Sequence, residues 1–366
     1  MKIKKLVALG AALGVAVSGL ALGAGAANAE PVSASYVMVG SDTLQDVTNA
    51  LSNSTSASGA TVRVTAGGKT IASFDAFGTA AIQTKPNGPY FGRPAGSGAG
   101  VNALRASING TNYSGNTAVP ARAVTGQIDI ARSSSGPGAN ASNSGKLAYV
   151  PFARDAVSYA YKGDSAVLGS LTAADLKAIY ESNTPVVRDG VTITALIPQS
   201  GSGTRNFFLG QIGVTNLGSA VDQKDGKTPE NDATVLGANQ IIPFSAGSWV
   251  AQANGVTGVS TIGTTGVQLG SLNGIAPFTG TGSALVPNAD FYSSSFGRDT
   301  YLVVERARIT SGDPKFDAGL TNLVDRTKSG SLTNFGALAS TPGAVKKKFG
   351  FLTPASTTVI FAYDTI

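Results

Sequence analysis

The sequence contains no cysteine and no histidine among its 366 residues. Without cysteine the chain has no disulfide bonds, no thiol nucleophile and no lipid anchor attached through sulfur. Without histidine it has no Ser-His-Asp triad, and the two absences together exclude the common zinc sites. We therefore expect no metal, no cofactor, no membrane anchor and no enzyme of these classes.

Long apolar runs are confined to the N-terminus. The pattern there is three lysines, an apolar stretch and a run of small residues, namely Lys2, Lys4 and Lys5, then Leu6 to about Ala24, then Ala27 to Ala29. This pattern predicts a signal peptide over residues 1–29 that is cleaved after Ala29. We therefore expect export to the extracellular or cell-wall space.

Charged side chains make up only 13% of the chain. Loss of residues 1–29 lowers the formal net charge from +6 to +3, because that segment carries three lysines and no acid. So small an excess is not typical of a nucleic-acid-binding surface. No later apolar run reaches the roughly 18 residues of a membrane span.

The mature chain is long enough for two hydrophobic cores. Short apolar runs alternate with segments of helical spacing, which predicts α/β layers with a largely parallel sheet. The predicted strands are Tyr36 to Val39, Ile128 to Ala131, Val157 to Tyr161, Thr192 to Ile197 and Tyr301 to Glu305. The predicted helices include Thr43 to Leu51, Val101 to Ile108, Ala173 to Tyr180, Arg205 to Ile212 and Leu320 to Arg326.

Three predicted helices begin at a turn rich in glycine and hydroxyl residues. The turns are Gly40 to Thr43, Gly96 to Gly100 and Ser200 to Arg205. A helix start offers unpaired amides and a partial positive charge, so several starts that converge would bind an anion. Each motif alone is equally a plain helix cap, Asp42 in particular. The candidate ligand-binding residues are Ser41, Asp42, Thr43, Ser97, Gly98, Ser202, Gly203 and Thr204.

A fourth candidate is the strand and loop from Asp129 to Gly136. It contains Arg132, Ser133 and Ser134, and a second arginine, Arg205, directly follows Thr204. A guanidinium group gives planar, bidentate donation to an oxyanion, so we add both arginines and both serines to the candidate site. Either arginine could instead be a surface charge or an intramolecular partner.

These motifs, in this order, resemble the phosphate-binding subunits of bacterial phosphate ABC transporters, as a secreted variant similar to those of actinobacteria. The similarity also covers three longer segments, Val150 to Val157, Leu171 to Tyr180 and Phe349 to Pro354. The resemblance implies a type II periplasmic-binding-protein fold, in which two α/β lobes joined by a two-strand hinge close over phosphate. It also implies a transporter permease as a possible partner and a monomer.

The sequence departs from this family at two places. The family usually has an acidic residue in the turn where Ser134 stands here, and its carboxylate accepts the phosphate proton. The family often has an arginine shortly before the Ser-Gly-Thr turn, where this chain has Pro198 and Gln199. By the resemblance, Arg205 is the candidate to replace that charge.

We therefore predict a signal peptide at 1–29, a discontinuous first lobe from 30–154 and 266–366, and a second lobe from 155–265. The predicted function is capture of a small oxyanion, with phosphate foremost, and not catalysis. Two alternatives stay open. One is an exported surface module that keeps the fold without transport. The other is a metal- or carboxylate-dependent phosphoester hydrolase that uses the acidic loop Asp222, Asp225, Glu230 and Asp232, which we interpret as solvated.

Overall fold

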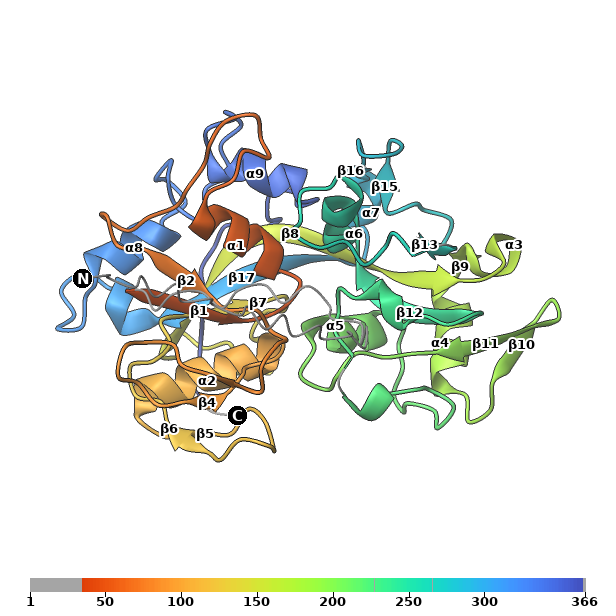
Figure 1. Ribbon diagram of the computed structural model, residues 1–366, viewed down its shortest axis with the longest axis horizontal. Coiled ribbons are helices and arrows are strands. Elements are labelled where there is room, and N and C mark those ends of the chain that lie inside the picture. The colour runs from red at the N-terminus through yellow and green to blue at the C-terminus, as the bar shows by residue number, and fades with distance from the viewer. Residues whose placement is uncertain (1–34, 227, 265, 365–366) are drawn as a thin grey trace, which may run out of the picture.

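The computed structural model describes residues 35–226, 228–264 and 266–364. The predicted signal peptide, residues 1–29, lies outside the described residues. The described chain forms two α/β lobes that lie side by side (Figure 1), which confirms the predicted fold class. Within these residues no helix combines the length and the apolar character needed to cross a bilayer.

The main sheet runs through both lobes in the order β10-β11-β12-β8-β17-β7-β1-β2, and β13 and β18 also pair with β8. All five predicted strands lie in this sheet. Its strands are β1 (Tyr36–Gly40), β2 (Ile71–Ser73), β7 (Ile130–Ser133), β8 (Leu147–Lys162), β10 (Val186–Arg188), β11 (Val191–Ala195), β12 (Gln240–Ser245), β13 (Val267–Leu269), β17 (Gly297–Glu305) and β18 (Ile360–Ala362).

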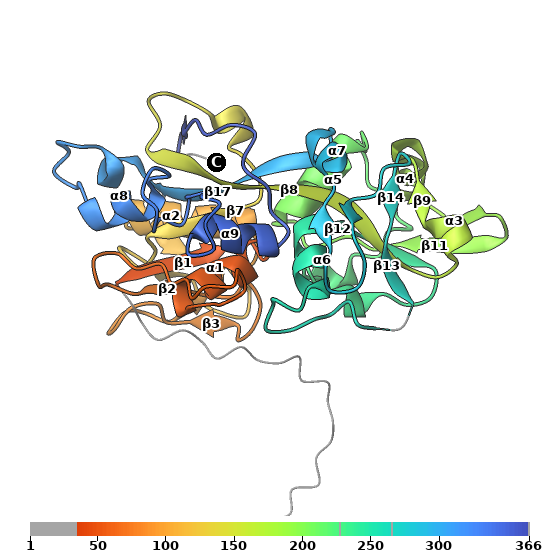
Figure 2. The same ribbon diagram turned by 90° about the horizontal axis from the view of Figure 1, so that it is seen from above.

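Two long strands connect the lobes. The first part of β8 pairs with β17 from Leu147 to Ala156, and its last six residues pair with β12. Figure 2 shows β8 and β17 running side by side from one lobe into the other. The sheet is continuous because one strand, β8, contributes to the sheets of both lobes.

The sheet is mixed, so the prediction of a largely parallel sheet was wrong. β1 is parallel to β2 and β7, and β11 is parallel to β12. β8 and β17 are antiparallel to every strand with which they pair. The reason is that the two connecting strands carry the chain between the lobes in opposite directions, and both are central in the sheet.

Helices cover both faces of the sheet in the first lobe, where α1 and α2 lie on opposite sides (Figure 1). The five predicted helices are present, although α1 begins two residues later than expected. The helices are α1 (Gln45–Asn53), α2 (Ser97–Asn109), α3 (Ser165–Leu168), α4 (Ala173–Glu181), α5 (Gly203–Gln211), α6 (Ala246–Ala253), α7 (Ala289–Ser293), α8 (Ala318–Val324) and α9 (Pro342–Lys348). Short strands form four hairpins or pairs, β3 (Ala81–Ile82) with β4 (Phe91–Gly92), β5 (Asn112–Tyr113) with β6 (Arg122–Ala123), β9 (Ser170–Leu171) with β14 (Ser271–Leu272) and β15 (Phe278–Thr279) with β16 (Val286–Pro287).

The alternating side chains of β1 show how the first lobe is built. Tyr36 and Met38 belong to one buried cluster, and Val37 and Val39 belong to another on the opposite face. Such period-two alternation with both faces apolar is typical of a strand covered on both sides. The first lobe therefore has a core on each side of its sheet.

The second lobe has a single large core that includes residues from Ala156 to Phe296. This core contains Phe291 and Tyr292, which follow the predicted lobe boundary at residue 265. The boundary stays a prediction, and the membership of this core favours a position near residue 297, where β17 begins.

Candidate functional site

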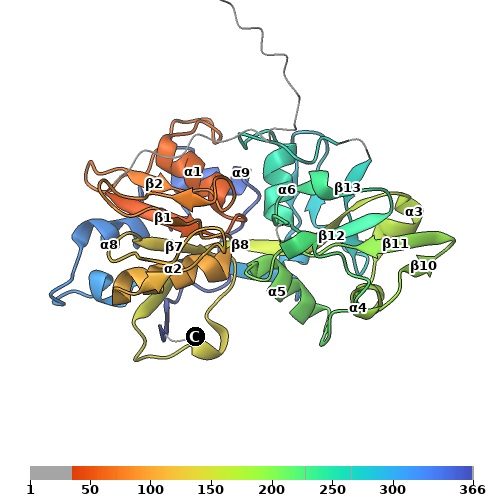
Figure 3. The same ribbon diagram turned by 60° about the horizontal axis from the view of Figure 1, so that its bottom comes forward.

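The three turns selected from the sequence meet between the lobes. The amide of Gly98, in the first turn of α2, donates to the carbonyl of Gly201, just before α5, at 3.2 Å. The hydroxyls of Thr43 and Thr204 lie 3.4 Å apart. We call the place where these contacts join the two lobes the junction. Figure 3 shows α2 and α5 on its two sides. The helix starts of both lobes therefore face one another.

Gly203 packs directly on two serine hydroxyls of the first lobe. A Cβ at this position would lie 2.3 Å from Oγ of Ser134 and 2.6 Å from Oγ of Ser97. The two hydroxyls are 3.0 Å apart, and the amide of Ser134 donates to Oγ of Ser97 at 3.0 Å. Only glycine allows the start of α5 to approach these hydroxyls so closely.

Two of the predicted serines have local partners. Oγ of Ser202 accepts the amide of Arg205 at 2.9 Å, so Ser202 is the N-cap of α5. Oγ of Ser133 donates to the carbonyl of Ser135 at 2.7 Å. For these two side chains the structure shows local roles in a cap and a turn.

The two predicted arginines bind the protein itself. Arg132 is fully buried, and its guanidinium donates to Oγ of Ser73 and to the carbonyls of Gly40, Ser41 and Phe74. Burial lowers the pKa of Arg132 to about 10, although nearby carboxylates favour its charged form. Arg132 therefore holds the ends of β1 and β2 together.

Arg205 forms its hydrogen bonds within its own lobe. Its guanidinium donates to the carbonyl of Pro198 at 2.9 Å and to Oε1 of Gln223 at 3.3 Å. Burial lowers the pKa of Arg205. The structure does not bring this side chain to the hydroxyls of Ser97 and Ser134.

The arginine that reaches the junction is Arg298, which the sequence analysis did not select. It lies at the start of β17 and is only 4% exposed. Its Nη2 donates to Oγ1 of Thr204 at 2.8 Å and to Oγ1 of Thr43 at 3.4 Å. One guanidinium group on a connecting strand therefore contacts a threonine from each lobe.

Asp155 holds Arg298 in place. Oδ2 of this buried carboxylate accepts from Nη2 of Arg298 at 2.8 Å and from Nε at 3.1 Å. Its Oδ1 accepts the hydroxyl of Ser245 and the amide of Gly247 at the start of α6. Asp155 lies on β8, so the ion pair joins the two connecting strands.

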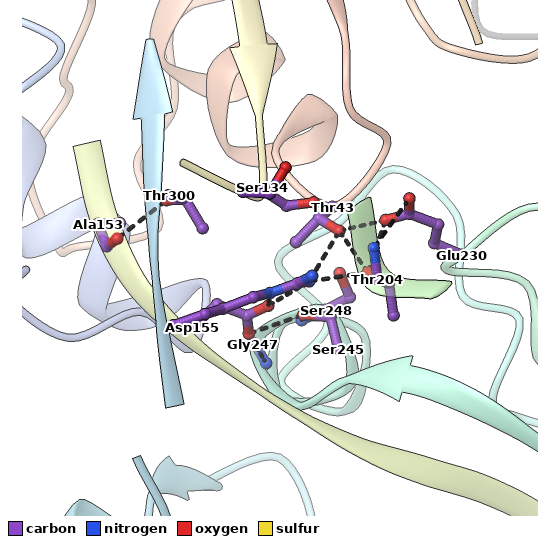
Figure 4. Close-up of polar contacts among 12 residues, drawn as sticks. Thr43, Ser134, Ala153, Asp155, Thr204, Glu230, Ser245, Gly247, Ser248 and Thr300 are labelled. Atoms are coloured by element: carbon purple, nitrogen blue, oxygen red, sulfur yellow. Dashed lines mark hydrogen bonds and ion pairs between the residues drawn. The ribbon is translucent and has the colours of Figure 1, made fainter. Parts of the chain in front are cut away.

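Two further carboxyl groups lie at the junction, one from each lobe. Oδ2 of Asp42 accepts the amide of Glu230 at 2.6 Å. Oε2 of Glu230 accepts the hydroxyls of Thr43 and Thr204, both at 2.7 Å (Figure 4). Burial, and next the proximity of Glu230, raise the pKa of Asp42.

Glu230 was interpreted from the sequence as part of a solvated loop, and this is wrong because its side chain is fully buried. Asp42 was interpreted as a helix cap, but no side chain caps α1. The carboxylate of Asp42 instead accepts the amide of Glu230 from the other lobe. No local pattern marks Arg298 or Glu230. Asp155 did stand in the segment that carries the family resemblance.

Several buried polar atoms of this junction have no hydrogen-bond partner among the described residues. They belong to residues that face the junction from both lobes and from β17. The atoms are Oγ of Ser41, Oδ1 of Asp42, both amide atoms of Gln199, Oγ1 of Thr228 and Nη1 of Arg298. Buried polar atoms are rarely left unpaired, so this concentration indicates a place where a polar ligand or water is bound.

In the part of the chain that the structure describes, no group of three or more acidic side chains is arranged to hold a metal ion. The junction offers hydrogen bonding from hydroxyls, amides and the guanidinium group of Arg298, together with acceptance by carboxylates.

Fold and site together define a two-lobed α/β binding protein with a buried polar site between its lobes. A family model described as the PBP superfamily domain matches residues 25–320, well over half of the chain. The chain therefore belongs to the PBP superfamily. No curated protein matches the sequence.

The solved structures that match this chain include three whose names describe phosphate transport or phosphate binding, all of low sequence identity. An ABC-type phosphate transport receptor from Vibrio cholerae has 15% identity and a TM-score of 0.48 over 87% of this chain and 100% of its own. A putative phosphate ABC transporter substrate-binding protein with bound phosphate, from Clostridium perfringens, has 13% identity and a TM-score of 0.43 over 78% and 92%. A phosphate-binding protein from Stenotrophomonas maltophilia has 11% identity and a TM-score of 0.46 over 88% and 91%.

Proposed function

We propose that the protein is an exported solute-binding protein that captures a small oxyanion, inorganic phosphate foremost, between its lobes for uptake. The observation that carries this proposal is the meeting of hydroxyls, helix starts and a buried guanidinium group from both lobes at one buried place. Membership of the PBP superfamily supports it. The proposal assigns no catalysis to the site, and the partner implied is the permease of a transporter.

The donors suit an oxyanion. Nη1 of Arg298 and Oγ of Ser41 are buried and have no partner among the described residues, so they are available to donate. The hydroxyl groups of Thr43 and Thr204 already converge on the same guanidinium group. Charge-assisted hydrogen bonds of this kind are the strong ones in buried sites.

The acceptors favour a protonated oxyanion. Oδ1 of Asp42 and Oε1 of Gln199 are buried acceptors that require a donor from the ligand. Hydrogen phosphate brings such a donor, whereas sulfate at neutral pH has none. The family carboxylate that Ser134 replaces in the sequence therefore has a substitute here in Asp42, which comes from another loop.

Calorimetry of the chain that begins at Glu30 tests the proposal. We expect micromolar or tighter binding of phosphate and at least tenfold weaker binding of sulfate. Arg298→Gln should weaken phosphate binding at least tenfold, because it removes a charged hydrogen bond. The matched control is Arg326→Gln, at an exposed arginine of the first lobe, which should bind as the wild type does.

The two other functions predict different results. Absence of binding by any small oxyanion, together with turnover of a phosphoester, would support the hydrolase and refute the receptor. Absence of both binding and turnover would support the surface module. Equal binding of sulfate and phosphate would refute the role given to the acceptors.

A further inference from the structure

Two buried carboxyl groups from opposite lobes meet at the junction. Asp42 precedes α1 in the first lobe, and Glu230 lies in a loop of the second. They are 1% and 0% exposed. Oδ2 of Asp42 accepts the amide of Glu230 at 2.6 Å, and Oδ1 of Asp42 has no partner among the described residues. This contact therefore joins the two lobes.

No cation neutralises this pair directly. Among the described residues, the groups that donate to the side chain of Glu230 are the hydroxyls of Thr43 and Thr204 and, at 3.4 Å, the amide of Thr204. Among the described residues neither Asp42 nor Glu230 forms an ion pair. The nearest guanidinium group across the threonines, Arg298, is already paired with Asp155.

The other charged groups that face Asp42 balance one another only in part. Arg132 lies close enough to Asp42 to interact electrostatically, but Asp46 and Asp75 face the same guanidinium group. Asp42 and Glu230 are therefore two buried carboxyl groups without a directly paired cation among the described residues. Two ionised carboxylates buried side by side are strongly unfavourable, and one proton held between them removes the repulsion.

We propose that closing the lobes takes up one proton from solvent, held by the Asp42–Glu230 pair, so that closure is coupled to pH. The step is protonation of one carboxylate to a carboxylic acid, and nothing else is transferred. In the open state Asp42 would face water and titrate near the ordinary value of an aspartate, about pH 4. In the closed state burial raises the pKa of Asp42.

The dependence of proton binding on closure fixes the direction in which pH changes the closing equilibrium. The closed state binds the proton more tightly than the open state, so the full stabilisation of closure is present below about pH 4. As the pH rises from there to the pKa of the closed pair, closure becomes about tenfold less favourable for each pH unit. A rise in pH therefore opens the lobes and favours release of the bound solute.

The distance between the lobes in the ligand-free protein tests this coupling. Because the natural chain has no cysteine, spin labels can be placed uniquely at Asn322→Cys on α8 and Ala178→Cys on α4, both exposed. Pulsed electron resonance between pH 4.5 and 8.5 should show the short-distance population falling as pH rises. The doubly neutral variant Asp42→Asn/Glu230→Gln should lose this dependence.

Asp46→Asn provides the matched control. Burial, and next the proximity of Asp75, raise the pKa of Asp46 to about 7, which lies within the pH range of the measurement. It lies in the first turn of α1, and no hydrogen bond among the described residues joins it to the second lobe. Its variant should keep the pH dependence. A wild-type distance that is independent of pH, or a dependence that survives in the doubly neutral variant, would overturn the proposal.

The coupling concerns the same site as the proposed function, and its role in solute release rests on that function. The distance measurement uses no ligand, so it is independent of whether phosphate binds. Calorimetry of phosphate binding in buffers of different ionisation enthalpy adds the number of protons taken up. If phosphate does not bind but the distance between the labels changes with pH, only the proposed function is refuted. If phosphate binds but the distance does not change with pH, only the coupling is refuted.

Discussion

Replacement of Arg298 by methionine separates what this residue does for the fold from what it does for the ligand. Arg298 is 4% exposed, and its partner Asp155 is 0% exposed. Two of its nitrogen atoms donate to Oδ2 of Asp155, at 2.8 and 3.1 Å. Methionine preserves much of the volume but removes both donors and the charge.

The expected loss of stability is large. In Arg298→Met, Asp155 keeps the hydroxyl of Ser245 and the amide of Gly247, at 2.8 and 3.0 Å, but it has no countercharge. Breaking a buried ion pair from one side lowers the free energy of unfolding by about 3–5 kcal/mol. For the ligand, loss of one charged hydrogen bond costs about 1.5–3 kcal/mol, which is roughly a 10- to 150-fold weaker Kd.

The double variant Arg298→Met/Asp155→Asn distinguishes the two effects. Asparagine can still accept from Ser245 and Gly247 but carries no charge, so most of the lost stability should return. Phosphate affinity should stay low, because the donor for the ligand is still missing. Urea denaturation measures the first quantity and calorimetry the second. Recovery of phosphate affinity in the double variant, or wild-type affinity in Arg298→Met, would refute the ligand role of Arg298.

Three other variants test separate parts of the structure. Gly203→Ala places a methyl group 2.3 Å from Oγ of Ser134, so it should prevent close approach of the lobes and weaken phosphate binding at least tenfold by calorimetry, while thermal unfolding of the open protein changes little. Gln199→Leu removes two buried amide atoms that have no partner among the described residues, so it should weaken phosphate binding without lowering Tm, and a lower Tm with unchanged affinity would contradict its place at the site. Lys346→Met removes the donor of two buried carbonyl groups, each at 2.9 Å, and should lower the free energy of unfolding by about 1–3 kcal/mol per carbonyl in urea denaturation, with phosphate affinity unchanged.

The sequence predicted the elements of the fold well because their signals are local. Alternation in Tyr36 to Val39 and helical spacing after Ser97 depend only on which faces are buried. The turns before α2 and α5 were found for the same reason, since glycine and hydroxyl residues mark helix starts. The mixed sheet was missed because the direction of β8 and β17 depends on how the two lobes are joined.

The polar pairs of the site could not be found in this way. Asp42 and Glu230 are 188 residues apart in the chain, and Asp155 and Arg298 are 143 apart. Neither pair lies at a short spacing that a sequence motif could mark. An isolated acidic residue or arginine is more often a surface charge. Arg132 illustrates the converse, because it stands in the expected loop but uses its donors on the backbone of its own lobe.

The position of the Arg298–Asp155 pair suits the proposed site to an anion that binds more tightly when the lobes close. Both residues lie on the strands that connect the lobes, and Asp155 is fixed further by the start of α6 in the second lobe. The guanidinium group is thus held at the hinge, where hinge motion displaces side chains least. Thr43 approaches it from one lobe and Thr204 from the other. An anion that binds Arg298 in the open state would contact only some of the donors of the site. The remaining donors would reach the anion when the lobes close. The anion would therefore bind the closed form more tightly and stabilise it.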